Sequence, residues 1–88
     1  MELYSLNFKT SAEKDLRRLP KAIIGRVMEV IEGLQLEPFP RKAIKLSGTE
    51  RLYRIPVGDY RIVYEVNTQN QKLTVYYIRH RREVYRRI

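Results

Sequence analysis

Hydrophobic and polar residues alternate most regularly from Leu52 to Val66, LYRIPVGDYRIVYEV. Gly58-Asp59 interrupts the alternation, and a glycine at the first position of a two-residue loop is typical of a type II′ β-hairpin turn. The turn predicts which residues face each other across two antiparallel strands. The predicted pairs are Val57 with Tyr60, Ile55 with Ile62 and Tyr53 with Tyr64. Because side chains alternate along a strand, these residues share one face, which we assign to the core.

The other face of the hairpin is predicted to be open and basic. It carries Arg54, Pro56, Arg61, Val63 and Glu65. Guanidinium groups bind phosphate oxygens in a bidentate manner, so two arginines on an open sheet face suit a nucleic-acid backbone. Proline donates no hydrogen bond to a neighbouring strand, and the sheet edge beside Pro56 is therefore expected to be open or bulged.

A strand and a short helix are predicted at the start of the chain. Residues 2 to 8 alternate as in a strand with one buried face. The side chains on that face are Tyr4, Leu6 and Phe8. Thr10 and Glu13 have the spacing of a capping box, and a helix is expected from about Ser11 to Arg18.

A second helix is predicted from Pro20 to about Gln35, because proline fits the first turn of a helix and apolar residues follow at helical spacing. These apolar residues are Ile23, Ile24, Val27, Val30, Ile31 and Leu34. The polar face includes Arg26, Glu29 and Glu32, a mixture of charges that is typical of a solvated surface. Pro38-Phe39-Pro40 ends this helix.

The remaining pattern predicts the rest of an antiparallel meander. Residues 43 to 46 form a short extended or loop segment, and 67 to 71 form a polar loop before a last strand, Leu73 to Arg79. Either Leu73, Val75 and Tyr77 or Thr74, Tyr76 and Ile78 face the core, and alternation does not decide between them. Residues 82 to 87 form one helical turn or a frayed tail. The fold class is thus α+β: an N-terminal strand, a helical hairpin and a β-meander with a short C-terminal tail.

Composition adds a charge argument to this outline. The 88 residues predict one domain, 1–88, with a compact core. There is no cysteine and no long apolar stretch, so we expect a cytoplasmic protein without disulfides or membrane contact. The formal net charge is +8. Residues 43 to 88 hold 10 basic and 4 acidic residues, against 8 and 6 in residues 1 to 42, which favours a polyanion site on the sheet and tail.

The order of the elements and three sequence motifs resemble those of a known protein family. The element order resembles the RelE/ParE superfamily of toxin–antitoxin toxins, and the RelE branch in particular. The motifs that carry the resemblance are KLSG (45–48), YRIPVGDYRIVYEV (53–66) and IRHRREVY (78–85). The resemblance implies a ribosome-dependent endoribonuclease that cuts mRNA in the decoding site and is held inactive by a cognate, RelB-like acidic antitoxin. It implies no small-molecule cofactor.

The resemblance also implies site residues. The basic and aromatic residues of the RelE active surface fall on Arg54, Arg61, Arg81 and Tyr85. Two lysines of the best-known RelE pattern are replaced, one by Arg54 and the other by Pro56. Because arginine does not lose its proton, His80 is the candidate for the missing general base. The residues that we assign to RNA binding are Lys45, Arg54, Arg79, Arg82, Arg86 and Arg87.

The chemistry expected of these residues is cleavage by the adjacent 2′-OH. This reaction needs a base for the 2′ proton, positive charge on the phosphorane and an acid for the 5′-oxygen. Arg61 and Arg81 suit the charge role, and Tyr85 suits proton donation or base stacking. One histidine and scattered carboxylates give no metal-ligand spacing, so no metal is expected.

Each assignment has an alternative that the sequence leaves open. Arg61 could pair with Asp59 or Glu65, Tyr85 could pack the tail onto the sheet, and His80 could be a packing residue. Two other functions also stay open: a ParE-like inhibitor of DNA gyrase and a noncatalytic RNA-binding module.

Overall fold

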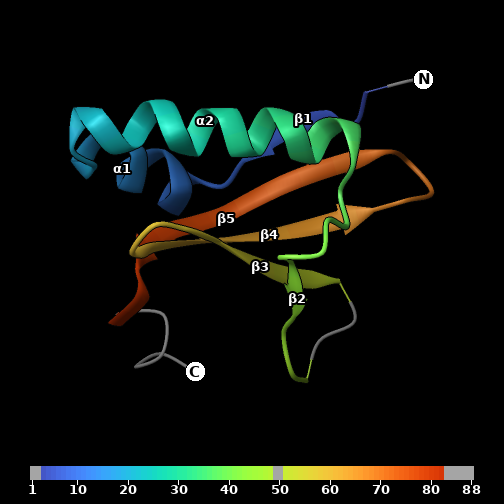
Figure 1. Ribbon diagram of the computed structural model, residues 1–88. Coiled ribbons are helices and arrows are strands. Elements are labelled where there is room, and N and C mark those ends of the chain that lie inside the picture. The colour runs from blue at the N-terminus through green and yellow to red at the C-terminus, as the bar shows by residue number, and fades with distance from the viewer. Residues whose placement is uncertain (1–2, 49–50, 83–88) are drawn as a thin grey trace.

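Five strands form one sheet in the order β1-β5-β4-β3-β2, and two helices precede its central hairpin. The computed structural model describes residues 3–48 and 51–82. The elements are β1 (Ser5–Phe8), α1 (Thr10–Arg18), α2 (Lys21–Leu36), β2 (Ile44–Lys45), β3 (Leu52–Val57), β4 (Tyr60–Asn67) and β5 (Lys72–His80). Figure 1 shows α2 lying along one face of the sheet. The predicted α+β class and element order are confirmed.

The β3–β4 hairpin has the predicted register. Its pairs include Val57 with Tyr60, Ile55 with Ile62 and Tyr53 with Tyr64. Gly58 has φ +61°, the positive value that the first position of a type II′ turn requires. In the described residues β2 pairs only with Tyr53 and Arg54 of β3, so the edge beside Pro56 is open as predicted.

A bulge in β5 explains why simple alternation gave no answer for this strand. Tyr64 is opposite Val75, but Val63 is opposite Tyr77, so Tyr76 is an extra residue that no β4 residue faces. The bulge changes the phase of the strand. Leu73 and Val75 are buried before it, and Ile78 is buried after it. Neither of the two predicted alternations is correct over the whole strand.

The core lies between the sheet and one side of α2. Val27, Ile31 and Leu34 of α2 are at most 1% exposed, and burying each contributes about 1.5–3 kcal/mol. From the sheet, Ile62, Tyr64 and Leu73 are fully buried in the same cluster. Tyr4, Leu6 and Phe8 of β1 pack against the cluster, as predicted, and so do Tyr53 and Tyr60.

Strand β1 joins the sheet by parallel pairing with β5. Where β1 ends, α1 lies beside the same edge of β5. The pairing extends from Ser5 opposite Lys72 to Phe8 opposite Val75. Beyond it, the Ser11 hydroxyl donates to the Tyr76 carbonyl (2.5 Å) and the Ile78 N–H donates to Asp15 Oδ2 (3.0 Å). Side chains of α1 thus satisfy backbone groups of β5 that would otherwise lack a partner strand.

Two predictions of local structure are wrong. The capping box does not form, because Lys9 is the N-cap and Thr10 is already helical. The Lys9 N–H is bonded to the Val75 carbonyl (2.9 Å), so the sheet holds the chain extended up to Lys9 and the helix begins immediately afterwards. Val63 was expected on an open face, yet it is fully buried between its register neighbours Arg54 and Tyr77.

The last described residues bear on the predicted C-terminal tail. Arg81 and Arg82 have helical backbone, while the rest of the predicted tail lies outside the described residues. No helix in the described part of the chain is long and apolar enough to cross a membrane.

Candidate functional site

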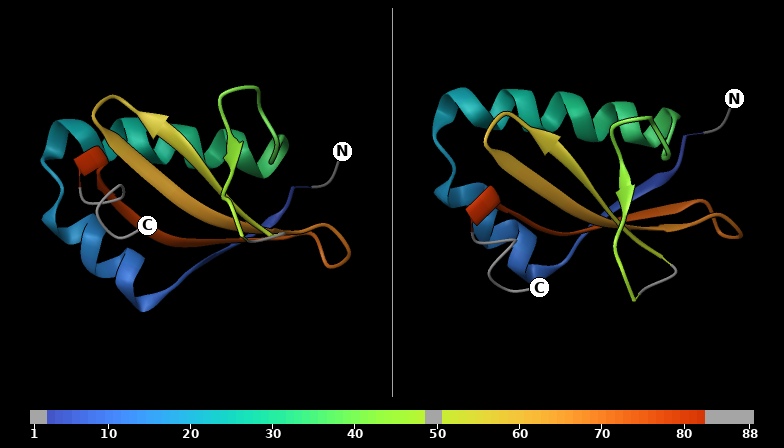
Figure 2. Two further views of the ribbon diagram at one scale, coloured as in Figure 1. Left: turned by 90° about the horizontal axis from the view of Figure 1, so that it is seen from below. Right: turned by 60° about the horizontal axis from the view of Figure 1, so that its bottom comes forward.

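The sheet face that points away from α2 is the one for which the sequence predicts RNA binding; we call it the outer face. Neither α1 nor α2 lies on it (Figure 2). The register aligns Arg61 with Arg79 on neighbouring strands, and Arg54 with Val63. The outer face therefore has basic residues around the buried Val63.

Arg61 is held at the hairpin turn by backbone carbonyls. Its Nη1 donates to the carbonyl oxygens of Gly58 (3.3 Å) and Tyr60 (3.1 Å). Glu65, an alternative partner for Arg61, is bonded elsewhere: it lies 3.6 Å from Arg51 Nη1 and accepts a hydrogen bond from Tyr76 (2.6 Å). The bond to Glu65, with partial burial, raises the pKa of Tyr76. The positive charge of Arg61 is thus positioned by neutral groups.

The end of β5 meets the same turn through the backbone. The Arg81 N–H donates to the Asp59 carbonyl at 2.8 Å. Arg81 and Arg82 are exposed. The fold therefore brings Arg61 and Arg81, two of the predicted catalytic residues, to the Gly58-Asp59 turn.

Arg79 has an acidic partner within the fold. Its Nε lies 3.4 Å from Asp15 Oδ2 of α1, and its guanidinium lies over the Tyr77 ring, 4.6 Å from the centroid. The two charged side chains are 18% and 13% exposed. Because the pair is largely removed from water, much of the Arg79 charge is already compensated inside the protein. Its role in RNA binding stays a prediction.

His80 and Lys45 lie on the opposite side of the sheet from Arg54 and Arg61. His80 is paired with Tyr60, and the two rings meet edge to face with centroids 5.5 Å apart. Lys45 is exposed and pairs with Tyr53, whose side chain faces the core. The structure therefore does not bring these two residues to the outer face. Tyr85, Arg86 and Arg87 lie outside the described residues.

The sequence analysis missed a third arginine at the turn. The guanidinium of Arg26 in α2 comes so close to Gly58 that a Cβ there would lie 3.4 Å from Nη1. We call Arg26, Arg61 and Arg81 the turn arginines. Helical periodicity placed Arg26 on a solvated face, and no local signal could have shown that this face meets the hairpin turn.

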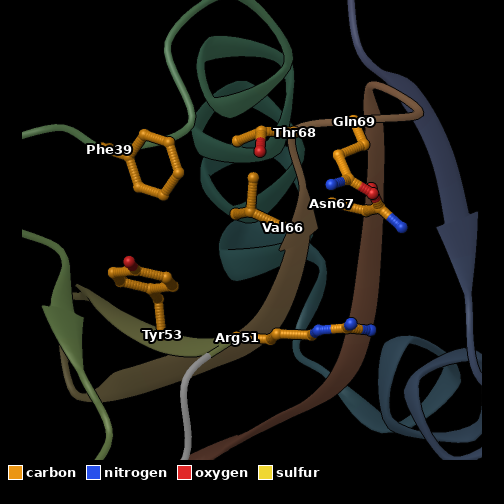
Figure 3. A pocket seen from close by; sticks show the side chains of 7 residues that line it. All are labelled: Phe39, Arg51, Tyr53, Val66, Asn67, Thr68 and Gln69. Atoms are coloured by element: carbon orange, nitrogen blue, oxygen red, sulfur yellow. The ribbon is translucent and has the colours of Figure 1, made fainter.

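The described surface has hollows at both ends of the β3–β4 hairpin. One, of about 160 Å³, lies between α1 and the end of β5 and is lined by residues that include Arg18, Tyr60 and His80. The other, of about 330 Å³, lies at the opposite end of the hairpin, between Phe39, Tyr53 and the β4–β5 loop (Figure 3). In residues 3–48 and 51–82, no three side chains of His, Asp or Glu converge on a possible metal position.

Known proteins share both the sequence pattern and the fold. Residues 6–85 match the family model described as the ParE toxin of type II toxin–antitoxin systems. The chain is 33% identical to toxin RelG of Mycobacterium tuberculosis, over 96% of this chain and 98% of the relative. It is also similar in structure to a chain of the archaeal RelE–RelB complex from Pyrococcus horikoshii. That match has a TM-score of 0.79 and 36% identity, and it covers 90% of this chain and 96% of the other.

The chain therefore belongs to the ParE toxin family of type II toxin–antitoxin systems. Within it the chain is RelE-like, because the matched relatives are RelE and RelG toxins. The isolated RelE toxin of Escherichia coli has the same fold, with a TM-score of 0.78 at 22% identity over 97% of this chain and 99% of that one.

Proposed function

We propose that this toxin is a ribosome-dependent endoribonuclease that cleaves mRNA by attack of a 2′-OH on the adjacent phosphate. The observation that carries the proposal is the cluster of turn arginines around the Gly58-Asp59 turn. The guanidinium of Arg61 is held by two carbonyls, the backbone of Arg81 is bonded to Asp59, and the guanidinium of Arg26 lies close to Gly58. Guanidinium groups gathered around one turn suit a phosphate whose charge increases during the reaction.

The proposed roles divide between charge stabilisation and proton transfer. The 2′-OH gives its proton to a general base as its oxygen forms a bond to phosphorus. The bond to the 5′ oxygen breaks as that oxygen gains a proton from a general acid, which leaves a cyclic phosphate and a 5′-OH. Arg61 and Arg81 stabilise the negative charge of the phosphorane between these steps. Tyr85 is proposed to act near the leaving group or to stack on a base. The assignment of His80 to proton transfer stays a prediction, because its register places it on the side of the sheet away from Arg61.

An acidic antitoxin is the proposed partner. The similar chain from Pyrococcus horikoshii was solved in a RelE–RelB complex. The present chain has a net charge of +8, and an acidic partner would complement that charge. We expect co-expression with an acidic protein encoded next to the toxin to yield a stable complex. Failure of every acidic neighbour to co-purify with the toxin would argue against this partner.

A paired assay separates the proposed activity from its alternative. The family model carries the ParE description, and both RelE lysines are absent here, so inhibition of DNA gyrase is the second candidate. We expect toe-printing to show cuts in mRNA on translating ribosomes, with no cuts in the same free mRNA and no effect on gyrase supercoiling. Inhibited supercoiling with intact mRNA would support the second candidate instead.

A further inference from the structure

The smaller hollow, which we call the α1–β5 cavity, combines an apolar floor with an aromatic wall. Leu19 and Ile78 are 8% and 1% exposed and form the floor. Tyr60 and His80 form the wall, with their rings at an angle of 77°. Rings of this kind are the usual platforms on which proteins stack unpaired nucleobases.

The charge around the cavity is positive. Arg18, the last residue of α1, is exposed and lines the opening. The one acidic residue in the lining is Asp15, and its charge is compensated by Arg79 at 3.4 Å. Arg17, Lys21 and Arg82 are exposed nearby in the sequence. A ligand with one anionic group beside a flat ring would complement this arrangement.

We propose that the α1–β5 cavity binds one pyrimidine nucleotide of an RNA strand, with the base against Tyr60 and His80 and its phosphate on Arg18. The cavity has about 160 Å³, and an engineered apolar cavity of roughly 150 Å³ holds one benzene ring. One six-membered ring therefore fills the hollow, whereas part of the two fused rings of a purine would lie outside it, in solvent. The inference rests on the proposed function, since RNA is the ligand, and it gives His80 a binding role on the side of the sheet away from Arg61.

The experiment follows the ring signals of His80 by NMR during titration of the full chain with mononucleotides. His80 is the chain's one histidine, so its ring resonances need no mutant for assignment. We expect cytidine monophosphate to shift them in a saturable manner. Adenosine monophosphate should bind more weakly, and ribose 5-phosphate, which lacks a base, should cause little change at the same ionic strength.

Arg18→Gln tests the phosphate contact, and Arg17→Gln is the matched control from the same helix turn. Loss of a charged hydrogen-bond donor should weaken binding of cytidine monophosphate by roughly tenfold in Arg18→Gln. Arg17 does not line the cavity, so its variant should bind as the unmodified chain does. Equal weakening in both variants would overturn the phosphate assignment, because it would indicate general electrostatic attraction.

Three other results would also overturn the proposal. An equal response to ribose 5-phosphate would indicate a phosphate site only, and equal binding of adenosine monophosphate would exclude the one-ring fit. A response to an acidic peptide with an aromatic residue, without a response to any nucleotide, would assign the cavity to a protein partner.

The titration contains no ribosome, so it can fail independently of the cleavage assay. A toxin that binds cytidine monophosphate but cuts no mRNA refutes only the proposed function. A toxin that cuts mRNA without this binding refutes only the cavity assignment.

Discussion

Arg61 and Arg81 reach the same turn by different routes, and the difference matters for their roles. The guanidinium of Arg61 is itself bonded to carbonyl oxygens, so its position is set before RNA binds. For Arg81 it is the backbone that is fixed, through its bond to the Asp59 carbonyl. Preorganised donors cost little reorganisation when charge develops, so Arg61 is suited to the transition state.

Replacing either arginine with alanine should slow cleavage of ribosome-bound mRNA by roughly two to three orders of magnitude, the usual cost of losing one transition-state donor. Single-turnover assays would measure this rate. The free energy of unfolding should change by about 0.5 kcal/mol at most, because neither side chain belongs to the core. Arg41→Ala, at an exposed arginine of the α2–β2 connection, is the control and should leave the rate unchanged.

The same assay decides whether this surface is the active site. Tyr85→Phe keeps the ring and removes the hydroxyl, so a large loss of rate would indicate proton transfer or a phosphate hydrogen bond. A small loss would indicate stacking. Full activity of Arg61→Ala, Arg81→Ala and Tyr85→Phe alike would show that the assignment is wrong.

His80→Gln distinguishes proton transfer from a role in binding. A histidine that acts as general base would give the pH–rate profile a limb that rises as the imidazole loses its proton. Because the ring faces Tyr60 and not Arg61, we expect the variant to keep the shape of its pH–rate profile and to show a higher KM. Disappearance of the limb near neutral pH would instead establish His80 as the base.

At the scale of elements, one buried hydroxyl ties the end of α2 to the centre of the sheet. The Tyr64 hydroxyl donates to the Pro38 carbonyl at 2.8 Å, and Tyr64 is fully buried. Tyr64→Phe leaves that carbonyl unsatisfied, so the free energy of unfolding should fall by about 1–3 kcal/mol in urea denaturation. Tyr77→Phe is the control, since in the described residues no bond is assigned to its hydroxyl, and it should change stability little.

Alkaline pH provides an independent test of the burial of the Tyr64 hydroxyl. Burial, and to a lesser extent Tyr53, raises the pKa of Tyr64 well above its ordinary value of about 10. Below pH about 10, Tyr64 keeps its proton in both the folded and the unfolded chain, and its contribution to stability is complete. Above it the unfolded chain loses the proton first, so the free energy of unfolding should fall as pH rises. The fall should be smaller in Tyr64→Phe, and identical slopes would contradict the assignment.

The elements also show where sequence patterns predict structure and where they do not. The hairpin register was predictable because Gly58 and the alternation around it are local constraints. The bulge at Tyr76 was not, because it depends on pairing with β4. The capping box failed for a related reason: a bond from Lys9 to Val75, far away in the sequence, decides where α1 begins. The site divides in the same way, since the motifs identified Arg61 and Arg81, whereas Arg26 and Arg18 gain their roles only through tertiary contacts.

At the scale of the whole molecule, charge is separated along the long axis of α2. The helix begins at the end of the molecule that holds the hairpin turn and the end of β5 (Figure 1). Lys21 and Arg26 lie in the half of α2 that is next to the turn, whereas Glu29, Glu32 and Glu37 follow toward the other end of α2. The counts for residues 1 to 42 hid this separation, because they average over both ends. A phosphate chain would therefore be drawn to the half of α2 that begins beside the hairpin turn and not to its other half.

The separation leads to a prediction about salt. Each phosphate neutralised on a single strand contributes about 0.7 to the slope of log K against log salt concentration. If Arg26 is one of the contacts at the turn, Arg26→Gln should weaken binding of a short single-stranded RNA and reduce this slope by about 0.7. Fluorescence anisotropy at several salt concentrations would measure both quantities.

Arg41→Gln removes the same charge from the connection that follows the other end of α2, and it should leave the slope unchanged. The two variants have equal net charge, so any difference between their slopes must come from where the charge lies. Equal slopes in both would mean that RNA responds only to total charge. In that case the cluster of Arg26 with Arg61 and Arg81 would not be the binding site, whatever its geometry.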